Sequence, residues 1–326
     1  MATKYRCVEC GKIYDQMRQD GFCSNSVCYG VGLLESFEDS DSESKFSNSV
    51  SADEIGLCVL VCDASGSMES HAFSENPASR IQLVANAAAA GISDYYRDAT
   101  DKKAQIFSKP EQAYIAIVGF GETASIIQGN DGKPFIKTLD QIQQEFPQRE
   151  DLSDFLHSSL TKLCPLNRKY TDITKALVLA KEIQDAALKG DLSAYGISGS
   201  FKVMEHDIVE KNSNNLLTVP NTRVLIYSDG GHNPGDGTSL SNPFESESLS
   251  TLMTVFLGNP DSTDLNERKG ADEMKSLACL CPIHKIVGYY LIDSPQRYAK
   301  LRGIFRMASG ASGFCPGCLA PPPKER

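Results

Sequence analysis

The sequence predicts an α/β fold with a doubly wound, mostly parallel sheet, preceded by a small Cys-rich module. From Glu54 onward, short apolar runs alternate with amphipathic stretches at helical spacing. The apolar runs are continuous, which is typical of parallel strands buried on both faces. Four cysteines in two short pairs precede the first run, in a segment too small to build a sufficient hydrophobic core.

The first half of this domain follows a strand, helix, hairpin and helix order. Residues 57–62 are six consecutive apolar residues and predict a buried strand. Residues 80–95 carry Ile81, Val84, Ala88 and Ile92 on one face, which predicts a helix. The apolar runs at 113–121 and 124–129 predict a strand pair, and 138–146 and 152–163 predict short helices.

The second half repeats this alternation. A stripe through Ile173, Leu177 and Ala180 predicts a helix over 171–187. Strands are expected at 223–229, 251–258 and 285–293, and a last helix at 294–307, where a serine and a proline stand at the helix start.

Composition bounds the class of protein. The chain has 326 residues, of which 41% are hydrophobic and 23% charged, enough for one large α/β domain with appendages. No apolar run is long enough to span a bilayer, and the N-terminus lacks the apolar core of a secretory signal, so we expect a cytoplasmic protein. A net charge of −10, from 42 acidic and 32 basic residues, argues against a broad nucleic-acid surface.

Changes in composition predict the domain boundaries. We expect a Cys-rich module at 1–34 and a flexible acidic, Ser-rich linker at 35–53, where aliphatic residues are almost absent. The α/β domain is expected over 54–312, with a polar insertion at 189–220. Residues 313–326 form a Cys/Pro-rich tail, which we expect to pack on that domain.

Oxygen-bearing side chains follow two of the predicted strands. Asp63, Ser65 and Ser67 come directly after the first strand, Asp229 closes the strand at 223–229, and Thr171 stands at a helix start. Because binding sites of open α/β sheets form beyond the carboxyl ends of the strands, we expect these residues to converge. Hard oxygens of this kind suit Mg²⁺, Ca²⁺ or Mn²⁺. The helix start adds a positive dipole end that favours an arriving anion.

The pattern Asp63-Ala-Ser65-Gly-Ser67, with Thr171 in TDITKAL and Asp229 in IYSDGG, resembles the metal-ion-dependent adhesion site (MIDAS) of von Willebrand factor A (vWA) domains. The resemblance covers residues 55 to about 310. It implies a metal ion on the upper rim of a doubly wound sheet, bound by Ser65, Ser67 and Thr171. Asp63 and Asp229 are implied to bind it directly or through water. A protein partner is implied to complete the coordination shell with an acidic residue.

Two other interpretations of these residues stay open. Ser and Asp after a strand often form only turns and helix caps. A Ser-His-Asp set is also conceivable, with Ser65 or Ser67, His232 and Asp229. No G-x-S-x-G surrounds either serine, and His232 lies three residues after Asp229 in a loop. We therefore interpret His232 as a loop histidine at the rim and expect no enzymatic activity.

The N-terminal cysteines predict a zinc site. Cys7 and Cys10 form a C-x2-C pair, and Cys23 and Cys28 form a C-x4-C pair. Four thiolates give a closed tetrahedral zinc site, although iron also accepts four thiolates. The stretch CVECGK resembles the knuckle of zinc ribbons, and we expect the metal to stabilise this short module.

The C-terminal cysteines predict a second zinc site. Its expected ligands are Cys279, Cys281, Cys315 and Cys318, with His284 able to replace one of them. A redox C-x-x-C, a disulfide and free thiols remain alternatives. The other cysteines, Cys58, Cys62 and Cys164, are predicted to be small buried hydrophobic residues.

These features together predict a non-enzymatic adaptor or scaffold that binds a protein partner through a metal ion. The combination resembles bacterial intracellular vWA proteins of the tellurite-resistance or stress-associated type. One alternative is a regulatory subunit of a nucleic-acid-linked or ATPase complex, in which the ribbon contacts nucleic acid or a partner. The near balance of charges in residues 1–34 gives that module little electrostatic attraction for phosphate. A metal-dependent hydrolase is the third alternative.

Overall fold

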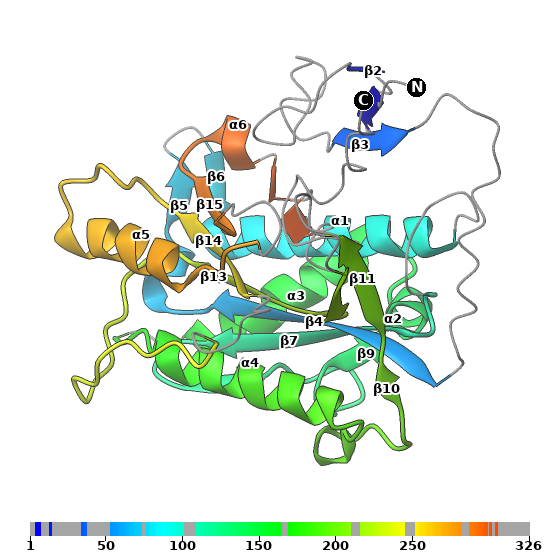
Figure 1. The fold of residues 1–326 in the computed structure, drawn as a ribbon. Coiled ribbons are helices and arrows are strands. Elements are labelled where there is room, and N and C mark those ends of the chain that lie inside the picture. Colours follow the sequence, from blue (N-terminus) through cyan, green and yellow to red (C-terminus); the bar gives the residue numbers. More distant parts are fainter. Residues whose placement is uncertain are drawn as a thin grey trace.

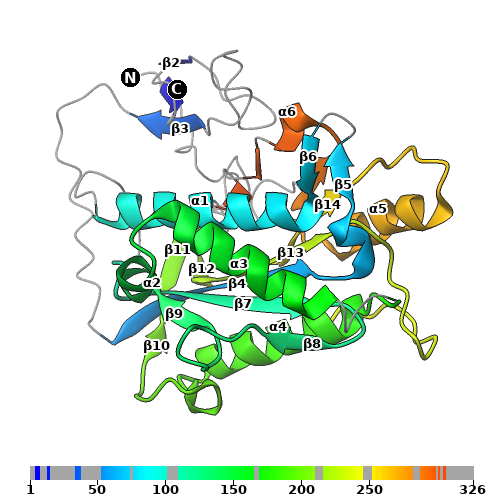
Figure 2. The same ribbon diagram turned by 180° about the vertical axis from the view of Figure 1, so that it is seen from behind.

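The structure is a computed structural model with a central sheet between two helical layers (Figures 1 and 2). It describes residues 4–7, 13–14, 34–37, 53–73, 76–100, 109–164, 169–209, 216–244, 252–281, 287–298, 300–301 and 304–305.

The central sheet confirms the predicted fold class. Its main strands run in the order β15-β14-β13-β4-β7-β8. The five strands from β15 to β7 are parallel, and β8 is antiparallel to β7. Their bounds are β4 Glu54–Asp63, β7 Ala113–Phe120, β8 Ala124–Ile126, β13 Thr222–Ser228, β14 Leu252–Leu257 and β15 Tyr289–Ile292. The short strands β9 (Ile136–Thr138) and β10 (Lys202–Val203) pair with β7 and β4.

Helices cover both faces of this sheet, as the continuous apolar strands predict. One hydrophobic cluster joins the sheet to α1 (Arg80–Thr100), α2 (Leu139–Glu145) and α3 (Arg149–Leu163). A second cluster, on the other face, joins it to α4 (Ile173–Leu188) and α5 (Leu265–Leu277). The two clusters draw on alternate residues of β4, because successive side chains of a strand point to opposite faces.

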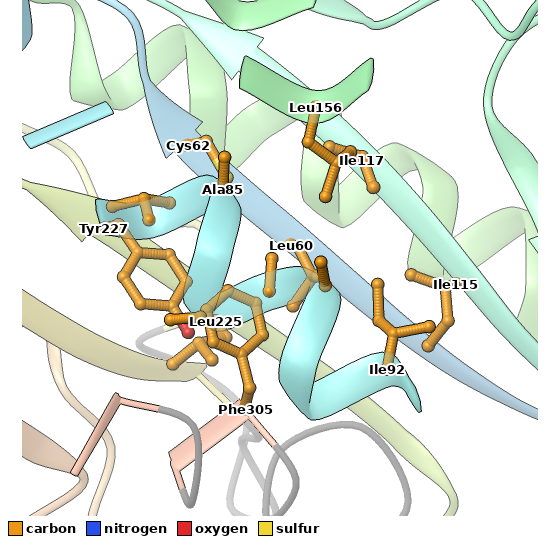
Figure 3. Packing of buried hydrophobic residues seen from close by; sticks show 14 of the residues in the cluster. Leu60, Cys62, Ala85, Ile92, Ile115, Ile117, Leu156, Leu225, Tyr227 and Phe305 are labelled. Carbon is orange, nitrogen blue, oxygen red and sulfur yellow. The ribbon is translucent and has the colours of Figure 1, made fainter. Parts of the chain in front are cut away.

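Figure 3 shows the first cluster at close range. Ala85 of α1 lies beside Cys62 of β4 in this view, and both side chains are almost completely buried. Phe305 stacks on Tyr227 of β13 with ring centroids 4.6 Å apart. Burial of a large apolar side chain contributes about 1.5–3 kcal/mol to the stability of the fold. Phe305 therefore helps to stabilise the packing against the central sheet.

Several smaller elements lie outside this core. Near the N-terminus, β1 (Lys4–Cys7) pairs with both β2 (Ile13–Tyr14) and β3 (Leu34–Phe37) in a three-stranded antiparallel sheet. β3 crosses the predicted boundary between the Cys-rich module and the linker. A 3₁₀ turn at Gly66–Glu69, called η2, is followed by an unpredicted hairpin of β5 (His71–Phe73) and β6 (Asn76–Ser79).

The predicted insertion has structure of its own. It contains a 3₁₀ turn, η4 (Ser193–Tyr195), and a hairpin of β11 (Glu205–Val209) and β12 (Leu216–Pro220). Between them, β10 extends the main sheet beside the first residues of β4. The segment is therefore partly integrated into the fold.

The start of α4 differs from the sequence prediction for a local reason. The helix predicted from residue 171 begins at Ile173, because the Asp172 carboxylate accepts a hydrogen bond from the Lys175 N–H at 3.0 Å and caps it. Within the described residues of the strand predicted over 285–293, β15 covers Tyr289–Ile292, and the described part of the last helix includes α6 (Pro295–Tyr298). None of the helices in the described residues has the length and apolar character needed to traverse a bilayer.

Candidate metal centre

The candidate site lies where the direction of chain winding reverses. β4 and β13 are neighbours, but the chain continues from β4 to β7 on one side and from β13 to β14 on the other. Such a switch point leaves a crevice beyond the carboxyl ends of the two strands. Asp63 is the last residue of β4, and Asp229 directly follows β13. Their side chains are almost completely buried, with residue exposures of 0% and 3%.

A continuous chain of hydrogen bonds joins four of the five predicted ligands. The Ser65 N–H donates to Asp63 Oδ1 at 2.8 Å. The hydroxyls of Ser65 and Ser67 lie 3.1 Å apart, and Ser67 Oγ donates to Asp229 Oδ1 at 2.8 Å. Ser65 is buried, whereas Ser67 is exposed, so the oxygen cluster reaches the surface at Ser67.

The loop that carries these serines is held in place by its own backbone. The Ala64 N–H donates to the carbonyl of Phe120 at 2.7 Å, which ties the loop to the end of β7. The Met68 N–H donates to the Ser65 carbonyl at 3.1 Å and closes the η2 turn. Because the Met68 side chain is fully buried, it anchors the turn.

Thr171 reaches the same rim through its backbone. The N–H groups of Thr171 and Asn233 donate to each other's carbonyls at 3.0 and 2.8 Å, which joins Thr171 to the loop after Asp229. The next N–H, of Asp172, donates to Gly121 just beyond β7 at 2.7 Å. Within the described residues, the Thr171 hydroxyl makes no hydrogen bond to the other predicted ligands.

The two carboxylates are held in an environment that disfavours their charge. Burial, reinforced by repulsion from Asp229, raises the pKa of Asp63 to about 7, although hydrogen bonds from Ser228 and Ser65 oppose the rise. Burial also raises the pKa of Asp229, against the stabilising effect of Arg80 and Ser67. A nearby cation would therefore stabilise the ionised form of both groups.

Three side chains in contact with the site were missed by the sequence analysis. Ser228 Oγ donates to Asp63 Oδ2 at 2.6 Å, and the guanidinium of Arg80 forms an ion pair with Asp229 Oδ2. Glu267 Oε1 lies 3.6 Å from Nη2 of Arg80. Ser228 stands inside the quoted stretch IYSDGG and follows from strand geometry, but no spacing rule identifies Arg80 or Glu267.

His232 does not form part of a catalytic triad in this structure. It lies in the loop after Asp229, as predicted, and its side chain is buried. Its Nδ1 accepts the Ile173 N–H at 3.2 Å and its Nε2 lies 3.0 Å from the Thr238 carbonyl. Both ring nitrogens therefore connect the loop after Asp229 to the start of α4, and neither has a hydrogen bond to Ser65 or Ser67.

Most of the predicted zinc ligands lie outside the described residues. These are Cys10, Cys23, Cys28, His284, Cys315 and Cys318. Cys7 ends β1. Cys279 and Cys281 flank Leu280, which forms an isolated bridge with Val287, and Cys281 is buried. Both zinc sites stay predictions. Cys58, Cys62 and Cys164 are almost fully buried, as predicted.

The donor set at the rim fits a hard cation. Among the described residues, no three His, Cys, Asp or Glu side chains gather into a metal-binding group. An ion at the rim would therefore rest on two carboxylates and on serine and threonine hydroxyls. This set matches the oxygen preference of Mg²⁺, Ca²⁺ or Mn²⁺ and lacks the nitrogen and sulfur ligands that zinc prefers.

Comparison with known proteins finds similar folds at low sequence identity. No protein-family model matches the chain, and no curated protein matches it. A solved von Willebrand factor type A structure from Catenulispora acidiphila is 13% identical, with a TM-score of 0.40 over 85% of this chain and 44% of that chain. This chain thus spans less than half the length of that protein.

Two Bacteroides structures are similar over nearly their whole length. An aerotolerance-related membrane protein from Bacteroides fragilis is 14% identical, with a TM-score of 0.38 over 76% of this chain and 96% of that chain. The conserved hypothetical protein BatB from Bacteroides thetaiotaomicron is 15% identical, with a TM-score of 0.39 over 78% and 98% of the two chains. At such identities, function has to be argued from the site itself.

Proposed function

We propose that this chain is a non-enzymatic protein-binding module in which a divalent cation at the rim receives a carboxylate of a partner. The observation that carries the proposal is the pair of buried carboxylates, Asp63 and Asp229, joined through the Ser65 and Ser67 hydroxyls at the switch point. Buried charges of one sign are costly unless counter-charges are present, and the ion pair with Arg80 offsets only one of these two carboxylates.

The residues that would hold the ion are Ser65, Ser67 and Thr171, with Asp63 and Asp229 direct or through water. When bound, the ion supplies a positive centre with a coordination position for an outside oxygen. The chain's own part is to fix the oxygens beforehand. Ser65 and Ser67 are held by η2, and Asp63 is held from both sides by Ser65 and Ser228.

The position of His232 speaks against a Ser-His-Asp triad at the site. In such a triad the imidazole takes the proton of the serine, and both nitrogens of His232 are engaged elsewhere. This observation favours binding over a triad hydrolase.

Capture of partners from the native host tests the proposal. Immobilised full-length chain should retain a partner with Mg²⁺ present and lose it when Mg²⁺ is omitted, when EDTA is added, and when Asp63→Ala replaces the wild type. Asp236→Ala, which removes an exposed carboxylate of the same rim, should leave capture unchanged. Because EDTA also removes zinc, the Mg²⁺ omission and the Asp63 variant decide the outcome. Equal capture in all arms would contradict the proposal.

A further inference from the structure

Arg80 places a positive charge inside the candidate metal centre. It is the first residue of α1, and its N–H donates to the Ser70 carbonyl at 3.0 Å, just beyond the serine loop. Its side chain is only 17% exposed. The guanidinium lies between two acidic groups, in an ion pair with Asp229 and 3.6 Å from Glu267 of α5.

The two oxygens of Asp229 have different partners. Oδ1 accepts the Ser67 hydroxyl and faces the serine cluster, whereas Oδ2 faces Arg80. The guanidinium therefore leaves the serine side of the carboxylate open while neutralising its charge. In the part of the chain that the structure describes, Nε of Arg80 is buried and has no hydrogen-bond partner. Only the outer end of the guanidinium is thus fixed, by the two carboxylates.

A divalent ion at the rim and the guanidinium of Arg80 would compete for the negative charge of Asp229. Asp63 and Asp229 contribute two negative charges when ionised, and Arg80 already balances one of them. Like charges a few ångströms apart repel strongly in a buried site. An ion that binds beside Ser65 and Ser67 therefore weakens the hold of Asp229 on Arg80, and Glu267 provides a second anion for the guanidinium.

From this geometry we propose that Arg80 is a resident counter-ion of the rim site. It neutralises Asp229 when no divalent ion is bound, and it lowers the affinity of the site for that ion. Glu267 receives the guanidinium when the ion arrives. The inference rests on the proposed function only in that the rim takes a divalent cation.

Mn²⁺ titration of the full-length chain, followed by the electron paramagnetic resonance signal of free Mn²⁺, tests this role. Arg80→Gln should bind Mn²⁺ about ten-fold more tightly or better, because a unit charge close to the ion is removed. Without divalent ion the same variant should melt at a lower temperature than the wild type, and Mn²⁺ should raise its melting temperature by more. Arg80→Lys, which keeps the charge, should stay near the wild type. Arg97→Gln, which makes the same charge change at the far end of α1, should leave Mn²⁺ affinity unchanged.

Glu267→Gln tests whether Glu267 receives the Arg80 guanidinium when the ion binds. It keeps an oxygen for the Asn259 N–H but removes the charge that would receive Arg80. Mn²⁺ affinity should fall, and the fall should be smaller when Arg80→Gln is also present. An equal fall in both backgrounds would overturn the role given to Glu267.

The counter-ion role of Arg80 would be overturned if Arg80→Gln did not raise the affinity for Mn²⁺. A structural or purely orienting arginine predicts equal or weaker Mn²⁺ binding in Arg80→Gln. If the wild type binds Mn²⁺ and this variant binds no more tightly, the counter-ion role fails and the proposed function stands. If neither the wild type nor Arg80→Gln binds Mn²⁺, both the counter-ion role and the proposed function fail.

Discussion

Replacement of Asp63 by Asn is expected to stabilise the ion-free protein. Asp63 is fully buried, and its pKa is raised from an ordinary value of 3.8 to about 7. At about 1.4 kcal/mol per pKa unit, ionised Asp63 costs up to roughly 4 kcal/mol in the folded state. An uncharged amide side chain at this position would avoid the cost and keep an acceptor for the Ser65 N–H, whereas the Ser228 hydroxyl would lose its carboxylate. We therefore expect a net gain of about 1–3 kcal/mol above pH 7.

The sign of the pH dependence follows from the same shift. A carboxyl whose pKa is higher in the folded state than in the unfolded state binds a proton on folding. The free energy of unfolding of the wild type therefore falls as the pH rises from about 4 to about 7. The advantage of Asp63→Asn should grow over that range and then level off. Mg²⁺ should restore stability to the wild type at pH 8 and have no effect on the variant.

Urea unfolding at pH 5 and pH 8 measures both effects. The buffer should be depleted of divalent ions on a chelating resin before the protein is added, so that no chelator acts on the predicted zinc sites. Ser228→Ala, which removes one hydrogen bond to Asp63 and no charge, is the matched control and should be destabilising. Equal stability of Asp63→Asn and the wild type at pH 8 would refute the argument that Asp63 is a costly buried charge.

Further predictions concern packing, thiols and zinc. Gly270→Ala should lower the free energy of unfolding by about 1–3 kcal/mol, because a Cβ at this position would lie 2.5 Å from the backbone of Gly230. Since Gly230 follows Asp229, the same variant should also bind Mn²⁺ more weakly. Unchanged urea unfolding would contradict this prediction. Cys58 and Cys62, whose pKa values burial raises to about 12, should resist iodoacetamide at pH 8 until denaturant is added, as peptide mass spectrometry would show. Elemental analysis should find about two equivalents of zinc, and a zinc-free protein would exclude both cysteine sites.

The sequence predicted the parallel sheet well because its signals are local. Continuous apolar runs marked β4, β7, β13 and β14, and helical stripes marked α1 and α4. The hairpin of β5 and β6 and the strand β10 were missed, since neither has an apolar pattern that sets it apart from a loop. The linker prediction at residue 35 overlooked β3, whose pairing with β1 depends on residues distant in sequence.

The candidate site was predictable to the extent that its residues end strands. Asp63 and Asp229 met as expected because β4 and β13 are neighbours, and the serines followed from the loop after β4. Arg80 could not be placed, since a charged residue at a helix start is ordinarily solvated. Its contact with Asp229 arises from the way α1 packs against the rim. The loop position of His232 was predicted, but its burial was not, because the packing of that loop against the start of α4 is a tertiary effect.

Diffraction from crystals grown with Mn²⁺ tests the central claim most directly. Anomalous scattering should give a peak at the rim, within coordination distance of Ser65 and Ser67, with Asp63 and Asp229 bound to it directly or through one water. Arg80 should have moved away from Asp229 toward Glu267. A rim without an anomalous peak at millimolar Mn²⁺, with Arg80 still paired to Asp229, would contradict the account.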